Sequence, residues 1–255
     1  MPFFKAAEKL VYYAHVPKCG GSAVGRYMQD RFGPLAFNDT RYLDRPEIER
    51  WTRSSPQHVD AATLARLVPL YMFDAIFTIV RHPVARVIST YHFQLEVEKC
   101  ISPGMGFSDW LAGLQTNPAD AAFAYDNHIR PMNQIVPDGA VVFHLEHGLD
   151  GLIPWFDLLT GTQAVSLAID TANKRGEHVT VRSTKVTPSS ADLSRIATLY
   201  AVDFARFGYA QQDRMPKAAA PVLTPDFIAT HGRALRAMKR PFARLRHKIT
   251  RRIGL

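Results

Sequence analysis

The amino-acid sequence predicts an α/β domain with three layers, in which helices cover both faces of a mostly parallel central sheet. Three apolar runs, at residues 10–16, 75–80 and 140–145, have the length and composition of buried strands. Segments with apolar residues at helical spacing follow them, and alternating strands and helices are typical of this class. The chain has 255 residues, of which 47% are hydrophobic, so it can bury a full core.

Each strand is expected to lead through a short loop into a helix. The first strand ends at a glycine loop, residues 17–22, and Ser22 is a suitable N-cap for a helix over residues 23–32. The second strand ends at Arg81, and Pro83 is placed to begin the next helix. We expect the other helices over residues 60–68, 84–97, 106–114, 120–135, 149–160 and 192–207.

Charge divides the chain into a neutral body and a basic tail. The formal net charge is +8, from 31 Lys and Arg against 23 Asp and Glu, but residues 227–255 hold nine basic residues and no acidic ones. The rest of the chain therefore has 31 minus 9, or 22, basic side chains against 23 acidic ones. Because the body lacks a basic surplus, we expect no nucleic-acid partner. We divide the chain into a domain over residues 1–210, a linker over 211–226 and the tail over 227–255.

Three features favour a cytoplasmic protein. Only two cysteines occur, Cys19 and Cys100, which argues against a disulfide-built secreted scaffold. No apolar stretch approaches the roughly 20 residues needed to cross a bilayer. The charges of Lys5, Glu8 and Lys9 also leave no apolar centre for a signal peptide. We therefore expect a cytoplasmic protein, with peripheral membrane attachment through the tail as an open alternative.

The tail predicts an amphipathic helix that is kinked at Pro241. Apolar residues recur there at three- and four-residue steps among the basic ones: Leu235, Met238, Phe242, Leu245, Ile249 and Ile253. Such a helix can lie on an anionic membrane surface, pack on a partner subunit, bind a polyanionic acceptor or dock on its own domain. The sequence does not choose among these four, and the oligomeric state is equally open.

The glycine loop after the first strand has the outline of a phosphate site. A glycine turn between a strand and a helix directs backbone N–H groups and the positive end of the helix dipole at one point. A tight turn without a ligand explains two glycines nearly as well. The common nucleotide motifs are absent, since no G-x-x-x-x-G-K-[ST] and no G-x-G-x-x-G occurs. The sequence therefore gives little support for ATP or NAD.

The loop itself is His15-Val16-Pro17-Lys18-Cys19-Gly20-Gly21-Ser22, followed by Ala23. It resembles the 5′-phosphosulfate loop of sulfotransferases that use 3′-phosphoadenosine 5′-phosphosulfate (PAPS), in the branch with the heparan sulfate 2-O-sulfotransferases and related bacterial proteins. Cys19 replaces the commoner Thr, and Ala23 replaces a frequent second hydroxyl. The resemblance implies a P-loop-like sulfotransferase fold, with residues Pro17 through Ala23 binding the cosubstrate.

The second strand ends in a motif that resembles the family's 3′-phosphate site. The run is Val80-Arg81-His82-Pro83-Val84-Ala85-Arg86-Val87-Ile88-Ser89-Thr90-Tyr91, in which His82 replaces the usual Asp or Asn. Arg81 can offer a planar fork to a phosphate, and Ser89 can add a hydroxyl. We expect Arg86 and Tyr91 to brace the loop. Both motifs follow strands of a parallel sheet, where ligands of open α/β sheets bind.

Two further segments resemble other parts of the family. Arg182-Ser183-Thr184-Lys185 and the helix near residues 199–209 resemble a closing region in which a basic loop folds over the nucleotide, so Arg182, Ser183 and Lys185 are candidate cosubstrate ligands. His128 and Arg130 lie in a segment that family members use near the acceptor. They are candidates for binding an anionic or hydroxylated acceptor, and the polarity of a helix surface explains them nearly as well.

Lys18 and His58 are the candidate catalytic residues. Sulfuryl transfer chiefly needs stabilisation of charge on the leaving group, which Lys18 can supply at the bridging oxygen. The acceptor hydroxyl needs a base, and the resemblance implies a histidine some two dozen residues before the arginine of the second motif; His58 precedes Arg81 by 23 residues. An exposed loop histidine is the alternative for His58. The transfer needs no metal, and His144-Leu145-Glu146-His147 is a weak metal motif.

The leading hypothesis is a PAPS-dependent sulfotransferase that acts on a hydroxyl, with a carbohydrate as the expected acceptor. A P-loop-like kinase shares the fold but needs a magnesium-binding Ser or Thr after a Gly-Lys pair, which this chain lacks. A non-catalytic nucleotide-binding or membrane-associated module is the other alternative. The sequence does not identify the acceptor.

Overall fold

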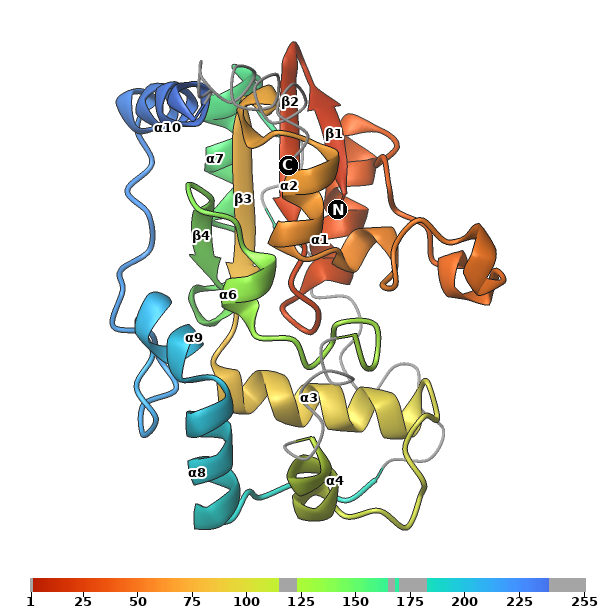
Figure 1. Cartoon of the computed structure of the whole chain (residues 1–255). Helices are drawn as coiled ribbons and strands as arrows, with labels where there is room; N and C mark the ends of the chain where they lie inside the picture. Colours follow the sequence, from red (N-terminus) through yellow and green to blue (C-terminus); the bar gives the residue numbers. More distant parts are fainter. Residues whose placement is uncertain (1, 115–122, 165–167, 170–182, 239–255) are drawn as a thin grey trace, which may run out of the picture.

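The computed structural model describes residues 2–114, 123–164, 168–169 and 183–238 (Figure 1). They form an α/β fold with one four-stranded sheet in the order β1-β2-β3-β4. The strands are β1 (Phe3–Ala6), β2 (Lys9–Ala14), β3 (Ala75–Val80) and β4 (Val141–His144). The three predicted strands pair in parallel, which confirms a mostly parallel sheet. The sequence analysis missed β1, an edge strand that pairs antiparallel with β2.

Helices connect the strands and continue beyond them. The α-helices are α1 (Gly21–Phe32), α2 (Ala61–Leu67), α3 (Pro83–Glu96), α4 (Phe107–Gly113), α6 (Met132–Ile135), α7 (Leu152–Thr160), α8 (Ser190–Leu199), α9 (Ala201–Arg206) and α10 (Pro225–Ala237). Short 3₁₀ helices are η1 (Tyr42–Asp44), η2 (Glu47–Glu49), η3 (Pro56–His58), η4 (Leu70–Met72) and η5 (Leu145–His147). In Figure 1, α3 crosses beneath the carboxyl ends of the parallel strands, where the two sequence motifs lie.

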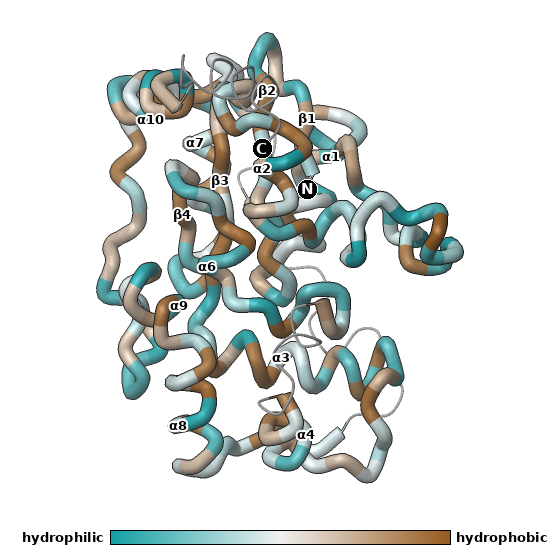
Figure 2. The backbone as a smooth tube through the Cα atoms, viewed as in Figure 1, coloured by the Kyte–Doolittle hydropathy of each residue, from teal (hydrophilic) through white to brown (hydrophobic). Residues whose placement is uncertain are grey.

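Apolar side chains pack on both faces of the sheet, because successive residues of a strand point to opposite faces. On β2, Val11 and Tyr13 belong to the larger apolar cluster, which includes residues of α1 and α7. Tyr12 and Ala14 belong to a second cluster with Leu64 of α2. All six residues of β3 are buried, and Figure 2 shows this strand as largely hydrophobic. The uninterrupted apolar run at residues 75–80 reflects burial on both faces.

Three predicted helices differ from the structure. α1 begins at Gly21 with Gly20 as its N-cap, so Ser22 lies in the first turn and the prediction of Ser22 as N-cap is wrong. Between residues 123 and 135 the chain forms a turn followed by the four-residue α6, instead of one helix. The helix expected over 192–207 is two helices that meet at Tyr200. The Tyr200 hydroxyl donates to the carbonyl of Ile129, which ties this break to the turn segment.

The first part of the tail is α10, which packs against α7, η4 and β3 of its own chain (Figure 1). Leu235 is fully buried, and the backbone N–H of Ile76 donates to Nε2 of His231 over 3.1 Å. Of the four alternatives for the tail, docking on its own domain therefore describes α10. The predicted kink at Pro241 lies outside the described residues. No helix in the described part of the chain is long and apolar enough to span a membrane.

Candidate active site

The two sequence motifs contact each other at the carboxyl edge of the sheet. β2 and β3 are adjacent and parallel, with Ala14 opposite Thr78, so the loops that follow them start side by side. Arg81 donates from Nη1 to the carbonyl of Lys18 over 3.2 Å. Arg86 is fully buried and donates from Nε to the carbonyl of Pro17 over 3.1 Å. The arginines after β3 thus hold the loop after β2 in place, as expected for Arg86.

The loop geometry suits an anion at the start of α1. Gly20 has φ of 84°, a left-handed conformation that glycine adopts without a Cβ clash, and the α-helix starts at the next residue. No acidic residue lies in the first turn of α1. The first amides of an α-helix have no partner within the helix, and the helix dipole favours negative charge there. Ser22 is exposed at this end, so its hydroxyl is accessible to a bound group.

Gly21 is packed directly under the imidazole of His15. A Cβ atom at Gly21 would lie 1.8 Å from Nε2 of His15, a distance that no non-bonded pair tolerates. The His15 ring stacks on Tyr13, with ring centroids 5.1 Å apart. Burial and the neighbouring charge of His58 lower the pKa of His15 well below its usual value. His15 is therefore a neutral support for the loop.

Cys19 and Ala23 turn inward and are buried. The thiol of Cys19 donates to the carbonyl of Pro17, and burial raises the pKa of Cys19 to about 12. A thiol with such a pKa stays protonated and is a poor nucleophile. Related loops commonly have a Thr hydroxyl at this position. In this chain the buried side chain of Cys19 supports the loop through its contact with the carbonyl of Pro17.

Lys18 lies over the aromatic ring of Phe93 from α3, with Nζ 3.6 Å from the ring centroid. The residue has φ of 66°, so the backbone itself is held in a left-handed conformation. Burial and the nearby Arg81 guanidinium lower the pKa of Lys18 to about 8. The ammonium group is thus partly desolvated and lies near the guanidinium of Arg81.

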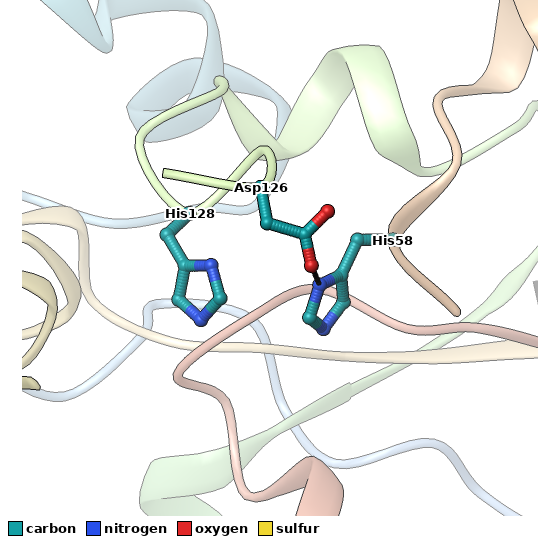
Figure 3. Close-up of side chains that lie close together, drawn as sticks. All are labelled: His58, Asp126 and His128. Carbon is teal, nitrogen blue, oxygen red and sulfur yellow. Dashed lines mark hydrogen bonds and ion pairs between the residues drawn. The ribbon is translucent and has the colours of Figure 1, made fainter. Parts of the chain in front are cut away.

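His58 forms a hydrogen-bonded pair with Asp126, a residue that the sequence analysis did not select. Nδ1 of His58 lies 2.7 Å from Oδ2 of Asp126, and both side chains are largely buried (Figure 3). Ser55 supports the carboxylate through its backbone N–H and its hydroxyl, each at 2.6 Å. Burial by itself would raise the pKa of Asp126. The hydrogen bonds from His58 and Ser55 outweigh this effect and lower the pKa. His58 is therefore buried and held in one orientation, and the alternative of an exposed loop histidine is wrong.

A turn with an unusual backbone conformation places Asp126 next to His58. Tyr125, Asp126 and Asn127 all have φ between 52° and 62°, in the left-handed region that L-residues avoid. Such conformations cost about 1–3 kcal/mol each and persist only where other contacts hold them. Asn127 is fully buried and donates from Nδ2 to the carbonyl of His58 over 2.7 Å. Arg86 holds the end of the turn by donating to the carbonyl of His128 over 2.9 Å.

His128 lies beside His58, as Figure 3 shows, with ring centroids 5.0 Å apart. Nδ1 of His128 donates to the carbonyl of Tyr125, and its ring stacks on Phe93. Burial, with smaller contributions from His58 and Lys18, lowers the pKa of His128 to about 3. His128 is thus a neutral imidazole within the site. It lies next to His58, the predicted base, and Lys18, which is predicted to stabilise the leaving group.

Arg130 is nearly buried and is tied to its own segment. It donates to Asn127 Oδ1 and Gln134 Oε1, and its guanidinium lies 4.7 Å from the ring centroid of Phe123. Burial lowers its pKa. Arg130 therefore buttresses the left-handed turn, and a contact between Arg130 and an acceptor stays a prediction.

The other predicted site residues that the structure describes lie on α3 or in the segment before α8. Ser89 is half-buried on α3, and Lys185 is exposed. Ser183 donates through its N–H and hydroxyl to Glu96 of α3, while Arg182 lies outside the described residues. Tyr91 donates to the carbonyl of Met105, so its described contact is with that segment and not with the glycine loop.

The departure at His82 also has a structural explanation. Its backbone N–H donates to Glu146 over 2.8 Å, and its Nε2 lies 2.9 Å from the carbonyl of Ala210. The Tyr209 hydroxyl donates to the second oxygen of the same Glu146 carboxylate. His82 therefore connects the end of β3 to the closing segment that follows α9.

Comparison with known families identifies the class of protein. A family model described as "Sulfotransferase family" matches residues 1–210. The chain belongs to the sulfotransferase family. This membership supports sulfuryl transfer as the general reaction, and the family implies an acceptor that bears a hydroxyl. No curated protein and no solved structure gave a match to this sulfotransferase.

Proposed function

We propose that this sulfotransferase moves the sulfuryl group of PAPS to a hydroxyl of a carbohydrate, with His58 as the general base. The observation that carries the proposal is the contact between the two motifs, in which Arg81 and Arg86 donate to the carbonyls of Lys18 and Pro17. Two separate phosphate-binding motifs fit a nucleotide with phosphates at both ends of its ribose. The packing of helices on both faces of the sheet is also consistent with a three-layer, P-loop-like sulfotransferase fold.

The residues around the loop suggest how PAPS would be held. The backbone amides from Lys18 to Ala23 and the exposed Ser22 would bind the 5′-phosphosulfate, and Pro17, which has no N–H, would shape the start of the loop. Arg81 keeps donors beyond the one used on Lys18, and with Ser89 it would bind the 3′-phosphate. Lys185 is exposed, and the hydroxyl of Ser183 donates to Glu96 of α3. Together with Arg182, these two residues of the closing segment are the other residues that we propose to contact PAPS.

The chemistry follows from the positions of Lys18 and His58. The acceptor oxygen attacks sulfur while the bond from sulfur to the 5′-phosphate oxygen breaks, and the charge of the leaving group grows on that oxygen. Lys18 would stabilise this charge. Nε2 of His58 would take the proton of the hydroxyl, and Asp126 would stabilise the resulting imidazolium through Nδ1. Neutral His128 would hydrogen-bond the acceptor beside the base.

The carbohydrate acceptor and the heparan sulfate 2-O-sulfotransferase-like branch rest on the resemblance of the two motifs. His128 lies in the site next to His58, which supports its proposed contact with the acceptor. Arg130 is committed to Asn127 and Gln134, so we propose for it an indirect part in shaping the acceptor side.

Nucleotide selectivity tests the proposal directly. Adenosine 3′,5′-bisphosphate should raise the melting temperature of the protein strongly and ATP only slightly, because at equal concentration the ligand that binds the folded state more tightly stabilises it more. Arg81→Met should remove the shift, whereas Arg66→Met, at an exposed position on α2, should retain it. Stronger stabilisation by ATP would contradict the proposal. Incubation with ³⁵S-labelled PAPS and cell extracts would then identify the acceptor.

The tail and the location of the protein remain proposals. Because α10 packs on its own domain, contact with an anionic membrane would fall to residues 239–255, whose sequence contains seven Lys and Arg residues. We propose a cytoplasmic protein that binds such membranes peripherally. Co-sedimentation with vesicles containing phosphatidylserine should fall for a chain that ends at Met238, and unchanged binding would exclude this role.

A further inference from the structure

We propose that His58, Asp126 and His128 form a site for one divalent transition-metal ion such as Zn²⁺, bound directly by the two imidazoles. Each of the three side chains offers a ligand atom, and these atoms lie within 4.8 Å of one another. Metal binding is a property of this cluster alone. Its consequence, reversible inhibition, rests on the proposed function, because the metal would occupy the base.

The hydrogen bonds at Nδ1 leave both Nε2 atoms as lone-pair donors. The carbonyl of Tyr125 can only accept, so Nδ1 of His128 carries the proton and Nε2 does not. The carboxylate of Asp126 accepts hydrogen bonds from the N–H and the hydroxyl of Ser55. It also accepts from Nδ1 of His58, so Nδ1 carries the proton and Nε2 of His58 does not. Among the residues that the structure describes, no hydrogen bond reaches either Nε2.

This arrangement is the one that metal-binding histidines generally show. Such histidines donate their other ring N–H to a carboxylate or a backbone carbonyl, which fixes the ring and strengthens it as a ligand. His58 has the carboxylate of Asp126 and His128 has the carbonyl of Tyr125. Figure 3 shows the two rings side by side: one nitrogen of His58 meets Asp126, and its other nitrogen lies at the same end of the rings as one nitrogen of His128.

Charge and access decide which metals fit. Both histidines are largely buried and keep 8% of their surface exposed. Imidazole ligands favour Zn²⁺, Co²⁺, Ni²⁺ and Cu²⁺ over Mg²⁺ and Ca²⁺, which prefer oxygen ligands. Lys18 and Arg81 nearby oppose a second positive charge, while Asp126 favours it. We therefore expect a reversible, moderate-affinity site rather than a permanent structural metal.

A bound ion would compete with catalysis at one atom. Nε2 of His58 has a single lone pair, which can bind a metal or accept the proton of the acceptor hydroxyl, but not both. Inhibition by Zn²⁺ should therefore be competitive with the acceptor and reversed by a chelator. The transfer reaction itself would still use no metal.

Cobalt provides a direct readout of binding that does not depend on turnover. The full-length, tag-free chain titrated with Co²⁺ should develop visible absorption bands that saturate at one equivalent in the submillimolar range, while Mg²⁺ should not displace the ion. His128→Phe keeps an aromatic ring against Phe93 and should weaken Co²⁺ binding at least about tenfold. His147→Phe removes an exposed histidine of the His144-x-x-His147 pair and should leave binding unchanged.

A second measurement avoids any question of folding in the variant. In the unmodified protein, Zn²⁺ should shift the imidazole ¹⁵N resonances of His58 and His128 and leave that of His82 in place. Absence of saturable Co²⁺ binding, wild-type affinity in His128→Phe, or Zn²⁺ shifts at other histidines would overturn the proposal. A protein that binds Co²⁺ here but transfers no sulfate would contradict the proposed function and leave the metal site intact.

Discussion

Asp126 holds the imidazole of His58 by a 2.7 Å hydrogen bond, although 68 residues separate the two in the chain. The contact fixes Nδ1 of His58 as the protonated nitrogen and directs Nε2 away from the carboxylate. A buried carboxylate behind an imidazole favours the charged form that appears when the base takes a proton. The pair therefore has the geometry that the proposed general base requires.

Asp126→Asn should lower kcat by about 10²-fold or more, because an amide cannot stabilise the imidazolium of His58 as a carboxylate does. The affinity for adenosine bisphosphate should change little. Steady-state kinetics over a range of pH would check this. Asp44→Asn, at an exposed position of η1, is the matched control and should behave as wild type. A wild-type rate in Asp126→Asn would show that the pair is only structural.

Lys18→Ala should lower kcat by about 10²–10³-fold, since the leaving oxygen would lose its cationic partner. Binding of adenosine bisphosphate should weaken far less, because the backbone amides of the loop remain. Lys9→Ala, an exposed lysine at the start of β2, serves as the control. Turnover of Lys18→Ala within a few-fold of wild type would rule out the proposed role.

Arg86→Met should destabilise the fold by about 2–5 kcal/mol, because the buried carbonyls of Pro17 and His128 lose their guanidinium donor and keep only the longer contacts from the Cys19 thiol and the Thr90 hydroxyl. Urea unfolding would measure the loss. The same variant should weaken nucleotide binding, since the loop is no longer held. Arg26→Met, at an exposed site on α1, should change neither quantity. If Arg86→Met unfolds at the wild-type urea concentration, the buried arginine is not a brace.

Gly21→Ala should destabilise the protein by about 1–3 kcal/mol through overpacking against His15. The double variant with His15→Ala should recover part of this loss, because the clashing ring is gone. Thermal unfolding of both single variants and the double variant would measure the coupling. Additive effects would mean that the two residues do not meet.

Acidification should destabilise the protein before its carboxylates titrate. Burial lowers the pKa of His128 to about 3, so the unfolded chain binds its proton more readily than the folded one at any pH between about 3 and 6.5. Stability from this residue is therefore complete above pH 6.5 and is lost as the pH falls. Between pH 7 and pH 5 the loss should be about 2 kcal/mol, since each pKa unit corresponds to about 1.4 kcal/mol.

The His128→Phe variant isolates this contribution, because phenylalanine does not titrate. Its unfolding free energy should depend less on pH between 5 and 7 than that of the wild type. Urea unfolding at the two pH values would measure the difference. An unchanged pH dependence would show that other groups cause the acid sensitivity.

Much of the fold could be predicted from local sequence. The continuous apolar runs marked β2, β3 and β4, because strands buried on both faces admit few polar residues. The edge strand β1 was missed, since its four residues carry too short a pattern. Of the helix expected over 120–135, the described part is helical only at Met132–Ile135. Before it, the tertiary contacts of Asn127 and Arg86 hold a backbone conformation that no propensity favours.

The sequence alone determined where the two loop motifs lie, marked Lys18 and His58 as candidates, and showed the split between a neutral body and a basic tail. These are local patterns, in which a few neighbouring residues carry the information. Only the tertiary structure decided that Asp126 supports His58, that His128 lies beside it, and that α10 packs on its own domain. These contacts join segments far apart in the chain, and a strained turn creates two of them, so no local pattern could reveal them.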